Sequence, residues 1–153
     1  MLRLSKTVDY ALIALMHLAQ QGEGGSWSAR EIASVNGLPQ DLLAKILQKL
    51  AREGLVVSQH GTKGGYRLGR PADRIDVVSV IEAVDGPLSL TQCFTDLGAC
   101  EQLDTCNVKS PLQRLNDQVL RMLSEVTIAR MCDDDFESLT SGLGEVQLPV
   151  IQD

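Results

Sequence analysis

Three of the four cysteines lie close together in the sequence, at Cys93, Cys100 and Cys106. Six residues separate the first pair and five separate the second, in a segment rich in Asp, Gly and Thr. Zinc ribbons and fingers usually pair their ligands about two to four residues apart. A wider triad of thiolates can instead wrap one larger inorganic cluster. The spacing therefore predicts a metal site, with an iron–sulfur cluster favoured over zinc.

Two other side chains are weaker candidates for ligands. Cys132 lies beyond the next predicted helix and is more typical of a spectator thiol than of a fourth ligand. His17 falls in an apolar N-terminal helix, where a partly buried structural histidine is the ordinary role. With two histidines, no phosphate-binding loop and no Ser/His/Asp set, the sequence indicates a binding protein and not an enzyme.

Two predicted helices flank the cysteine segment. Residues 76–84 carry apolar side chains at helical spacing, and Asp85-Gly86-Pro87 ends that helix. Residues 110–131 carry a heptad seam, because six apolar residues follow each other at steps of three or four. These are Leu112, Leu115, Val119, Met122, Val126 and Ala129. One helix of more than about 20 residues with a single apolar stripe needs a partner, so we expect a homodimer through residues 110–131.

The N-terminal half has the pattern of a winged helix-turn-helix. Apolar periodicity predicts helices over residues 6–20, 29–35 and about 40–53, and Ser28 with Glu31 forms a capping-box pattern before the second. Two short β-like runs around a glycine-rich basic turn follow, which predicts a hairpin over residues 55–68. The expected fold is mostly α with a small β-hairpin wing, followed by a long dimerisation helix.

The second helix of such a motif enters the major groove of DNA, and the wing meets the backbone or the minor groove. Residues 1–74 hold ten Lys and Arg against six Asp and Glu, a net charge of +4, although the whole chain carries -6. This half suits a polyanion, and double-stranded DNA is the predicted partner. The alternative is that these charges only solvate exposed faces. The candidate DNA-binding residues are Ser28, Gln40, Lys45, Gln48, Lys49, His60, Thr62, Lys63, Gly64, Gly65 and Arg67.

The sequence divides into five predicted parts. They are a winged-helix domain (1–74), a connecting helix (75–90), a cysteine loop (91–109), a dimerisation helix (110–131) and a flexible acidic tail (132–153). No uncharged apolar stretch reaches the roughly 18 residues that cross a bilayer, and Arg3, Lys6 and Asp9 interrupt any signal-peptide core. We therefore expect a cytoplasmic protein without a membrane partner.

Three segments resemble the Rrf2 (Rrf-two) family of regulators: SKTVDYAL at 5–12, GTKGGYRL at 61–68 and VIEAVDGP at 80–87. The similarity runs over residues 1–131. Within the family, MLRLSK at 1–6 and GPLSLT at 86–91 most resemble regulators of the SUF system of iron–sulfur cluster assembly. The resemblance implies a homodimer on a partly palindromic operator. It also implies a 2Fe–2S or 4Fe–4S cluster held by three cysteines and one other group.

The fourth ligand is where the sequence departs from part of the family. Members of the IscR type place a histidine three residues after the last cysteine, and here Lys109 stands there, which cannot ligate as a cation. Members of the NsrR type use an acidic residue of the first helix across the dimer, and Asp9 matches it. The resemblance thus implies Asp9 as ligand, although a carboxylate favoured by the helix dipole or paired with Lys6 is the alternative. The resemblance further implies repression of cluster-assembly genes in response to cluster, redox or nitric-oxide status. The alternative is a zinc-stabilised DNA-binding or interaction module that has no sensing role.

Overall fold

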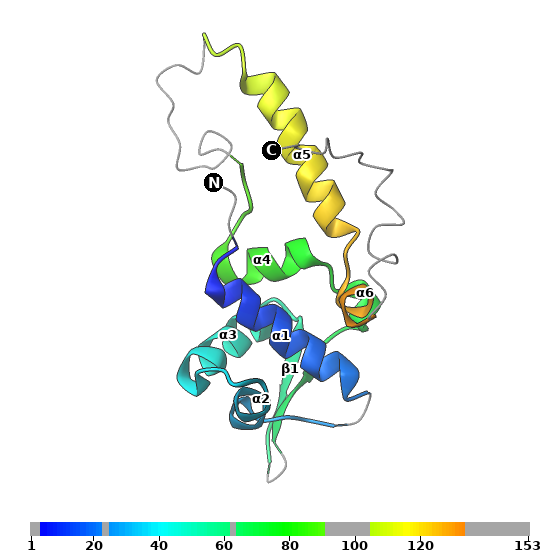
Figure 1. Ribbon diagram of the computed structural model, residues 1–153. Helices are drawn as coiled ribbons and strands as arrows, with labels where there is room; N and C mark the ends of the chain where they lie inside the picture. The colour runs from blue at the N-terminus through cyan, green and yellow to red at the C-terminus, as the bar shows by residue number, and fades with distance from the viewer. Residues whose placement is uncertain (1–3, 23–24, 62–63, 91–104, 134–153) are drawn as a thin grey trace, which may run out of the picture.

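The computed structural model describes residues 4–22, 25–61, 64–90 and 105–133, which are mostly helical (Figure 1). Cys93, Cys100, Thr62 and Lys63 lie outside the described residues, as do residues 134–153 of the predicted tail. In chain order the elements are α1 (Lys6–Gln20), α2 (Ala29–Asn36), α3 (Gln40–Arg52), β1 (Val56–Gln59), β2 (Gly65–Leu68), the 3-10 helix η1 (Ala72–Arg74), α4 (Val77–Asp85), α5 (Lys109–Ser124) and α6 (Ile128–Cys132).

Local signals set the ends of the first three helices. Ser5 caps α1 by accepting a hydrogen bond from Val8 N at 3.2 Å. The predicted capping box of Ser28 and Glu31 starts α2. Gly37 ends α2 with φ +65°, a left-handed conformation that glycine adopts without strain. Because the chain turns there, α3 follows α2 after a short connection, and the two form the predicted helix-turn-helix.

The wing is a hairpin with a third extended segment beside it. β1 and β2 pair antiparallel, with Val56 opposite Leu68 and Gln59 opposite Gly65. Tyr66 of β2 also exchanges two backbone hydrogen bonds with Trp27, at 2.9 and 2.7 Å. The chain that leads into α2 therefore lies along β2 and ties the wing to the helix-turn-helix. The sequence predicted the hairpin but not this third segment.

The core forms around α1, which contacts α3, α4 and α6. Leu15 of α1, Leu47 of α3 and Val80 of α4 have no exposed side-chain surface. Burial of such an aliphatic side chain contributes about 1.5–3 kcal/mol. The core thus holds α3 on the body from its inner side and leaves its outer side to solvent.

The single helix predicted over residues 110–131 is two helices in the structure. α5 ends at Ser124 and α6 begins at Ile128. Between them, Val77 N donates to Val126 O at 2.9 Å, and Ile128 N donates to Ile75 O at 2.8 Å. This β-type pairing with the start of α4 uses backbone groups that a continuous helix would need. The apolar seam continues through Val126, but the helix does not.

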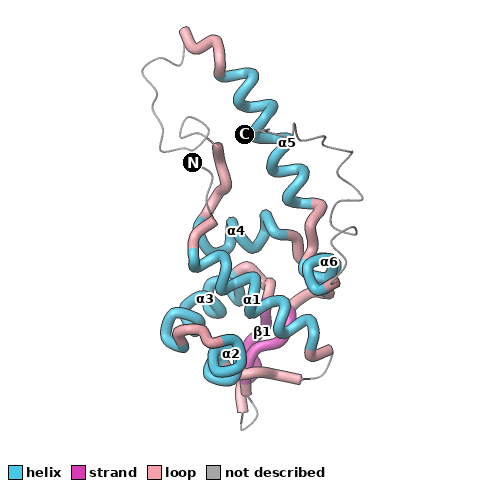
Figure 2. The backbone as a smooth tube through the Cα atoms, viewed as in Figure 1, coloured by secondary structure: helices cyan, strands magenta, loops and turns pink. Residues whose placement is uncertain are grey.

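α5 extends away from the rest of the described chain, while its C-terminal end joins the body through α6 (Figures 1 and 2). α5 contacts α4, and α6 contacts both α1 and η1. Among the described residues, no helix has the length and apolar character needed to cross a membrane.

Candidate functional site

The outer face of α3 carries three of the polar side chains predicted to contact DNA. Gln40, Lys45 and Gln48 are exposed, whereas the leucine and isoleucine side chains opposite them are buried. The buried face fixes the helix, so the amide and ammonium groups project from a rigid support. Such groups hydrogen-bond to base edges and phosphates.

Lys49 does not belong with this exposed set. Its side chain is half-buried, and its Nζ donates to the carbonyl oxygen of Val84 at 2.5 Å. Val84 lies in the last turn of α4, where carbonyl groups have no partner within the helix. The ammonium group of Lys49 thus joins α3 to the end of α4, and its contact with DNA stays a prediction.

Ser28 lies at the start of α2 with its hydroxyl group engaged in the capping box. The Ser28 hydroxyl donates to Glu31 Oε2 at 2.7 Å and accepts from Glu31 N at 3.2 Å. The bond from the Ser28 hydroxyl to this carboxylate, together with one from the Ser28 backbone N–H at 2.7 Å, holds the pKa of the Glu31 carboxyl below its ordinary value. Ser28 therefore orders the first turn of α2, and its contact with DNA stays a prediction.

The wing presents two of its predicted DNA-binding side chains to solvent. His60 and Arg67 are exposed. Thr62 and Lys63, at the tip, lie outside the described residues. The described part of the wing therefore carries a guanidinium and an imidazole group that can reach a phosphate backbone.

Gly64 and Gly65 are explained by contacts within the chain. A Cβ atom on Gly65 would lie 2.6 Å from the backbone carbonyl carbon of Trp27, and one on Gly64 would lie 2.6 Å from the carbonyl oxygen of Gln59. Any other residue would clash with backbone at both positions. The two glycines thus allow close approach between segments of this chain, and their contact with DNA stays a prediction.

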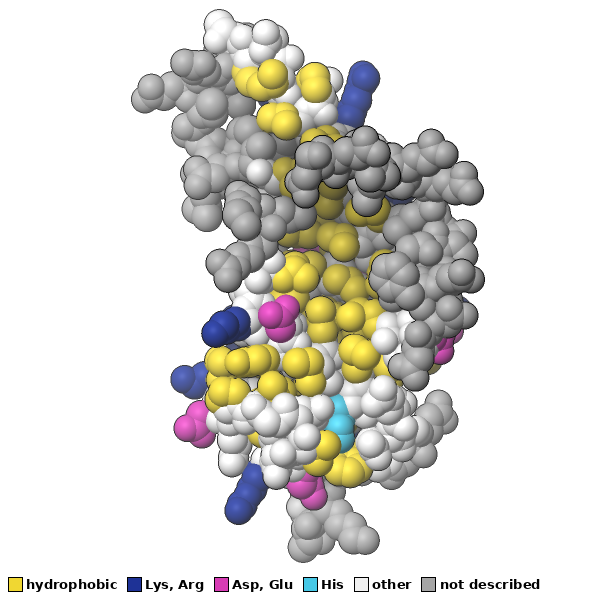
Figure 3. All heavy atoms as spheres, in the orientation of Figure 1, with side chains coloured by type: hydrophobic (Ala, Val, Ile, Leu, Met, Phe, Trp, Pro, Cys, Tyr) yellow, Lys and Arg dark blue, Asp and Glu magenta, His cyan; other side chains and the backbone are white. Residues whose placement is uncertain are grey.

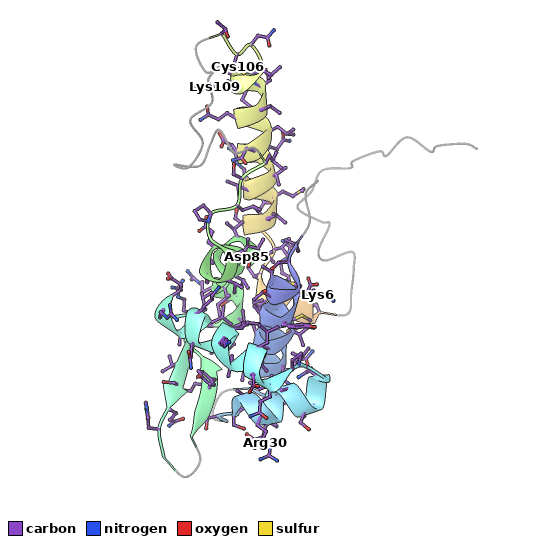
Figure 4. All side chains as sticks on the ribbon, turned by 90° about the vertical axis from the view of Figure 1, so that its left-hand side faces the viewer. Lys6, Arg30, Asp85, Cys106 and Lys109 are labelled. Atoms are coloured by element: carbon purple, nitrogen blue, oxygen red, sulfur yellow. The ribbon has the colours of Figure 1, made fainter. Side chains whose placement is uncertain are left out.

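Arg30 is a further candidate that the sequence reasoning did not single out. It lies in the first turn of α2, is exposed, and sits at the end of the molecule opposite to Cys106 (Figure 4). A basic side chain beside the N-terminus of a helix is well placed to meet a phosphate group. The signal was available in the sequence, since Arg30 is the second residue after the capping Ser28.

Cys106 is the only member of the cysteine triad within the described residues. Its thiol is free and half-buried, three residues before α5 begins at Lys109. Cys106 and Lys109 lie at the end of α5 that is remote from the body (Figure 4). In the part of the chain that the structure describes, no group of three His, Cys, Asp or Glu side chains could hold a metal ion.

Asp9 and Cys106 are not brought together within one chain. Asp9 is exposed on the first turn of α1. Lys6, which begins the same turn, lies at the level of α4, far along the molecule from Cys106 (Figure 4). A site that used both residues would have to take them from two chains.

Cys132 and His17 pack into the body of the protein, where they contact other residues of the chain. The Cys132 Sγ lies 3.8 Å from the carbonyl oxygen of Met16, and burial, followed by the charge of Asp133, raises the pKa of its thiol. His17 is buried, with its ring edge-on to Trp27 at 4.9 Å. Neither residue neighbours Cys106.

Apolar side chains gather over α1, α4 and the lower part of α5 on the face shown in Figure 3. The exposed large hydrophobic side chains include Leu4 and Ile13 in the α1 region and Leu115 and Met122 in α5. Each of these four side chains is at least 36% exposed. An extended apolar surface of this kind is typical of a site for another protein chain.

Comparison with known proteins identifies the family. A family model described as "Rrf2: Iron-dependent Transcriptional regulator" matches residues 4–134. The structure of CymR from B. subtilis, titled the global cysteine regulator, is 29% identical with a TM-score of 0.69, and the match covers 86% of this chain and 97% of that one. IscR from T. potens is 28% identical with a TM-score of 0.65, covering 85% of each chain. CymR from Staphylococcus aureus is 27% identical with a TM-score of 0.63, covering 84% of this chain and 97% of that one.

The winged helix, the exposed polar face of α3 and the apolar face of α1 and α5 all agree with this similarity. Members of the family are dimeric regulators that bind DNA, and they are not enzymes. This chain therefore belongs to the Rrf2 family of transcription regulators.

Proposed function

We propose that this chain is an iron–sulfur-dependent regulator that represses genes of iron–sulfur cluster assembly. The observation that carries the proposal is the cysteine triad placed between α4 and α5, in a chain whose family model describes iron-dependent regulators. Such a protein would work in the cytoplasm, where free thiols persist and can serve as ligands.

DNA recognition is assigned to α3 and the wing. In a winged helix, the second helix of the motif lies in the major groove. We assign base and phosphate contacts to Gln40, Lys45 and Gln48 of α3, because they are exposed on its rigid outer face. His60 and Arg67 of the wing, also exposed, would reach the adjacent backbone or minor groove.

The chemistry of the donor set fits an iron–sulfur cluster. Cys93, Cys100 and Cys106 would supply three thiolates, and Cys106 is a free thiol that packs against no other described cysteine. Asp9 of the second chain would supply the fourth donor, since the Asp9 of the same chain lies far from Cys106. When bound, a cluster supplies iron centres that react with oxidants or nitric oxide.

Regulation would act through the position of the triad in the chain. The cysteine segment connects α4, which packs on α3, to α5, which carries the exposed apolar side chains. Operator half-sites about one helical turn apart require a defined distance between the two α3 helices of a dimer. Tying the three cysteines together, or releasing them, would alter that distance.

Gel-shift titration tests the proposal on one duplex, selected from a random library by the anaerobic holo protein. We expect the Kd of the holo and apo proteins to differ at least about tenfold, or about 1.4 kcal/mol. The variant Cys93→Ala/Cys100→Ala/Cys106→Ala should have the Kd of the apo protein. The matched control Cys132→Ala should have the Kd of the wild type in both forms. Equal affinity of holo, apo and triple-variant protein would exclude a sensing role.

A regulator without a cluster is the second candidate function. The similarity to CymR from B. subtilis, a cysteine regulator by its title, is as high as the similarity to IscR. A zinc-stabilised module without sensing is a form of the same alternative. Anaerobic purification separates these cases, because a cluster protein is coloured and contains iron and sulfide, whereas a zinc protein is colourless.

A further inference from the structure

The C-terminal end of α4 is held by a side chain from α3. Lys49 Nζ donates to Val84 O, one of the last carbonyl groups of a helix that ends at Asp85. These carbonyl groups have no partner inside the helix, and a positive charge beside them also interacts favourably with the helix dipole. The lysine of the DNA-reading helix thus acts as a C-terminal cap for α4.

Six residues further along, the chain is held by a side chain from α5. Asn116 Oδ1 accepts a hydrogen bond from Leu90 N at 3.0 Å. Asn116 is 8% exposed and is the one buried residue of α5. A buried amide is costly unless it is hydrogen-bonded, so this bond specifies where residue 90 lies against α5.

The two contacts are joined by one short piece of backbone. Residues 84–90 include Gly86, whose N–H bonds to Glu82 O at 3.1 Å and closes the last turn of α4. Residue 90 is the last described position before the cysteine segment. A shift of α5 or of the cysteine segment can therefore reach α3 through this piece of chain, which is fixed to α5 at one end and to α3 at the other.

We propose that Lys49 and Asn116 are positioning residues through which residues 84–90 set the orientation of α3 on DNA. The proposal rests on the proposed function only in taking α3 as the DNA-reading helix, and it holds for any occupant of the cysteine segment. Lys49 then affects DNA affinity through α4 and α5, in contrast to Lys45, which is exposed on the same helix.

A double-mutant cycle tests this coupling on the full-length apo protein. Lys49→Met keeps the aliphatic stem and removes the donor, and Asn116→Leu removes the acceptor at similar volume. We expect each single change to raise the Kd for the selected duplex about fivefold. The Kd of the double variant should not exceed the higher of the two single-variant values, as for residues in one network. Lys49→Arg, which retains a donor, should bind within about twofold of wild type.

Lys45→Met provides the matched control. Combined with Asn116→Leu, it should show fold-changes that multiply, because Lys45 lies outside the network. If the fold-changes in Kd for Lys49→Met and Asn116→Leu also multiplied in the double variant, the proposal would be overturned.

A second measurement does not depend on DNA or on the folding of the Asn116 variant. Hydrogen exchange of the Leu90 amide should become at least about threefold faster in Lys49→Met than in Lys45→Met, since the opening of one contact loosens the other. Unchanged exchange would also overturn the proposal. If the wild type bound no duplex specifically, the proposed function would fail, and the exchange result would still decide on the link between α3 and α5.

Discussion

Burial of His17 should make the stability of the fold depend on pH. Burial lowers the pKa of His17, and Asn36 Nδ2 lies 3.4 Å from its Nδ1, which accepts a hydrogen bond only when it is unprotonated. Between the ordinary pKa of 6.5 and the lower pKa of the folded state, the unfolded chain therefore binds a proton that the folded chain does not. Stability should therefore fall as the pH falls through 6.5 toward the lower pKa of the folded state, by at most about 1.4 kcal/mol per pH unit.

Urea unfolding between pH 5.5 and 7.5 measures this dependence. His17→Gln retains an acceptor but does not titrate, so its unfolding free energy should vary less over this range. His60→Gln is the matched control, because His60 is the other histidine of the chain and is exposed on the wing. If the unfolding free energy of His17→Gln depended on pH as strongly as that of the wild type, another group would be responsible for the dependence.

At the scale of the elements, the wing depends on the close approach of Gly65 to Trp27. An added Cβ would lie within 2.8 Å of three Trp27 backbone atoms. Gly65→Ala should therefore break the backbone pairing of Trp27 with Tyr66 and destabilise the protein by about 2 kcal/mol. Trp27 is the one tryptophan of the chain, so its fluorescence reports the change directly.

The control for Gly65→Ala is Ser58→Ala, an exposed change in β1 opposite Tyr66. It should shift the unfolding free energy by less than about 0.5 kcal/mol and leave the emission maximum unchanged. A native-like fluorescence and stability in Gly65→Ala would contradict the assigned role of this glycine.

The exposed side chains of α5 should support the dimer. Leu115 and Met122 are 49% and 38% exposed in the single chain. Charges placed on a buried apolar interface are costly, so Leu115→Glu/Met122→Glu should weaken dimerisation at least about tenfold. Analytical ultracentrifugation measures this shift. Gln113→Glu is the control, because Gln113 is exposed and lies two residues before Leu115, on another side of α5, so this variant should remain dimeric. If Leu115→Glu/Met122→Glu remained dimeric, the interface would lie elsewhere.

Elements with strong local signals could be predicted from the sequence. The bounds of α1, the capping box of α2 and the hairpin all depend on residues close in the chain. The end of α5 could not be predicted, because Val126 keeps the apolar spacing while its carbonyl bonds to Val77, far away in the sequence. The bond of Lys49 to Val84 could not be predicted for the same reason, since helical periodicity does not reveal that α4 ends beside this lysine.

At the scale of the whole molecule, α5 separates two parts of the predicted metal site. Cys106 lies at the remote end of α5, whereas Lys6 and the first turn of α1 lie near its base (Figure 4). The four donors proposed for a cluster can therefore meet only if the second chain supplies Asp9. Three cysteines could be recognised from spacing, but this separation follows only from the fold.

Mixed dimers provide a direct test of ligation between chains. A dimer of one Asp9→Ala chain and one Cys106→Ala chain keeps one complete donor set if Asp9 acts across the dimer, because the intact cysteines of the first chain face the intact Asp9 of the second. The same dimer keeps no complete set if Asp9 and the cysteines act within one chain. We therefore expect differently tagged, co-purified mixed dimers to hold about half the iron and sulfide of the wild type, while either variant homodimer holds little, as expected when a ligand is removed. Iron content in the mixed dimer as low as in the homodimers would exclude ligation by Asp9 across the dimer, and full occupancy in the Asp9→Ala homodimer would exclude Asp9 as a ligand altogether.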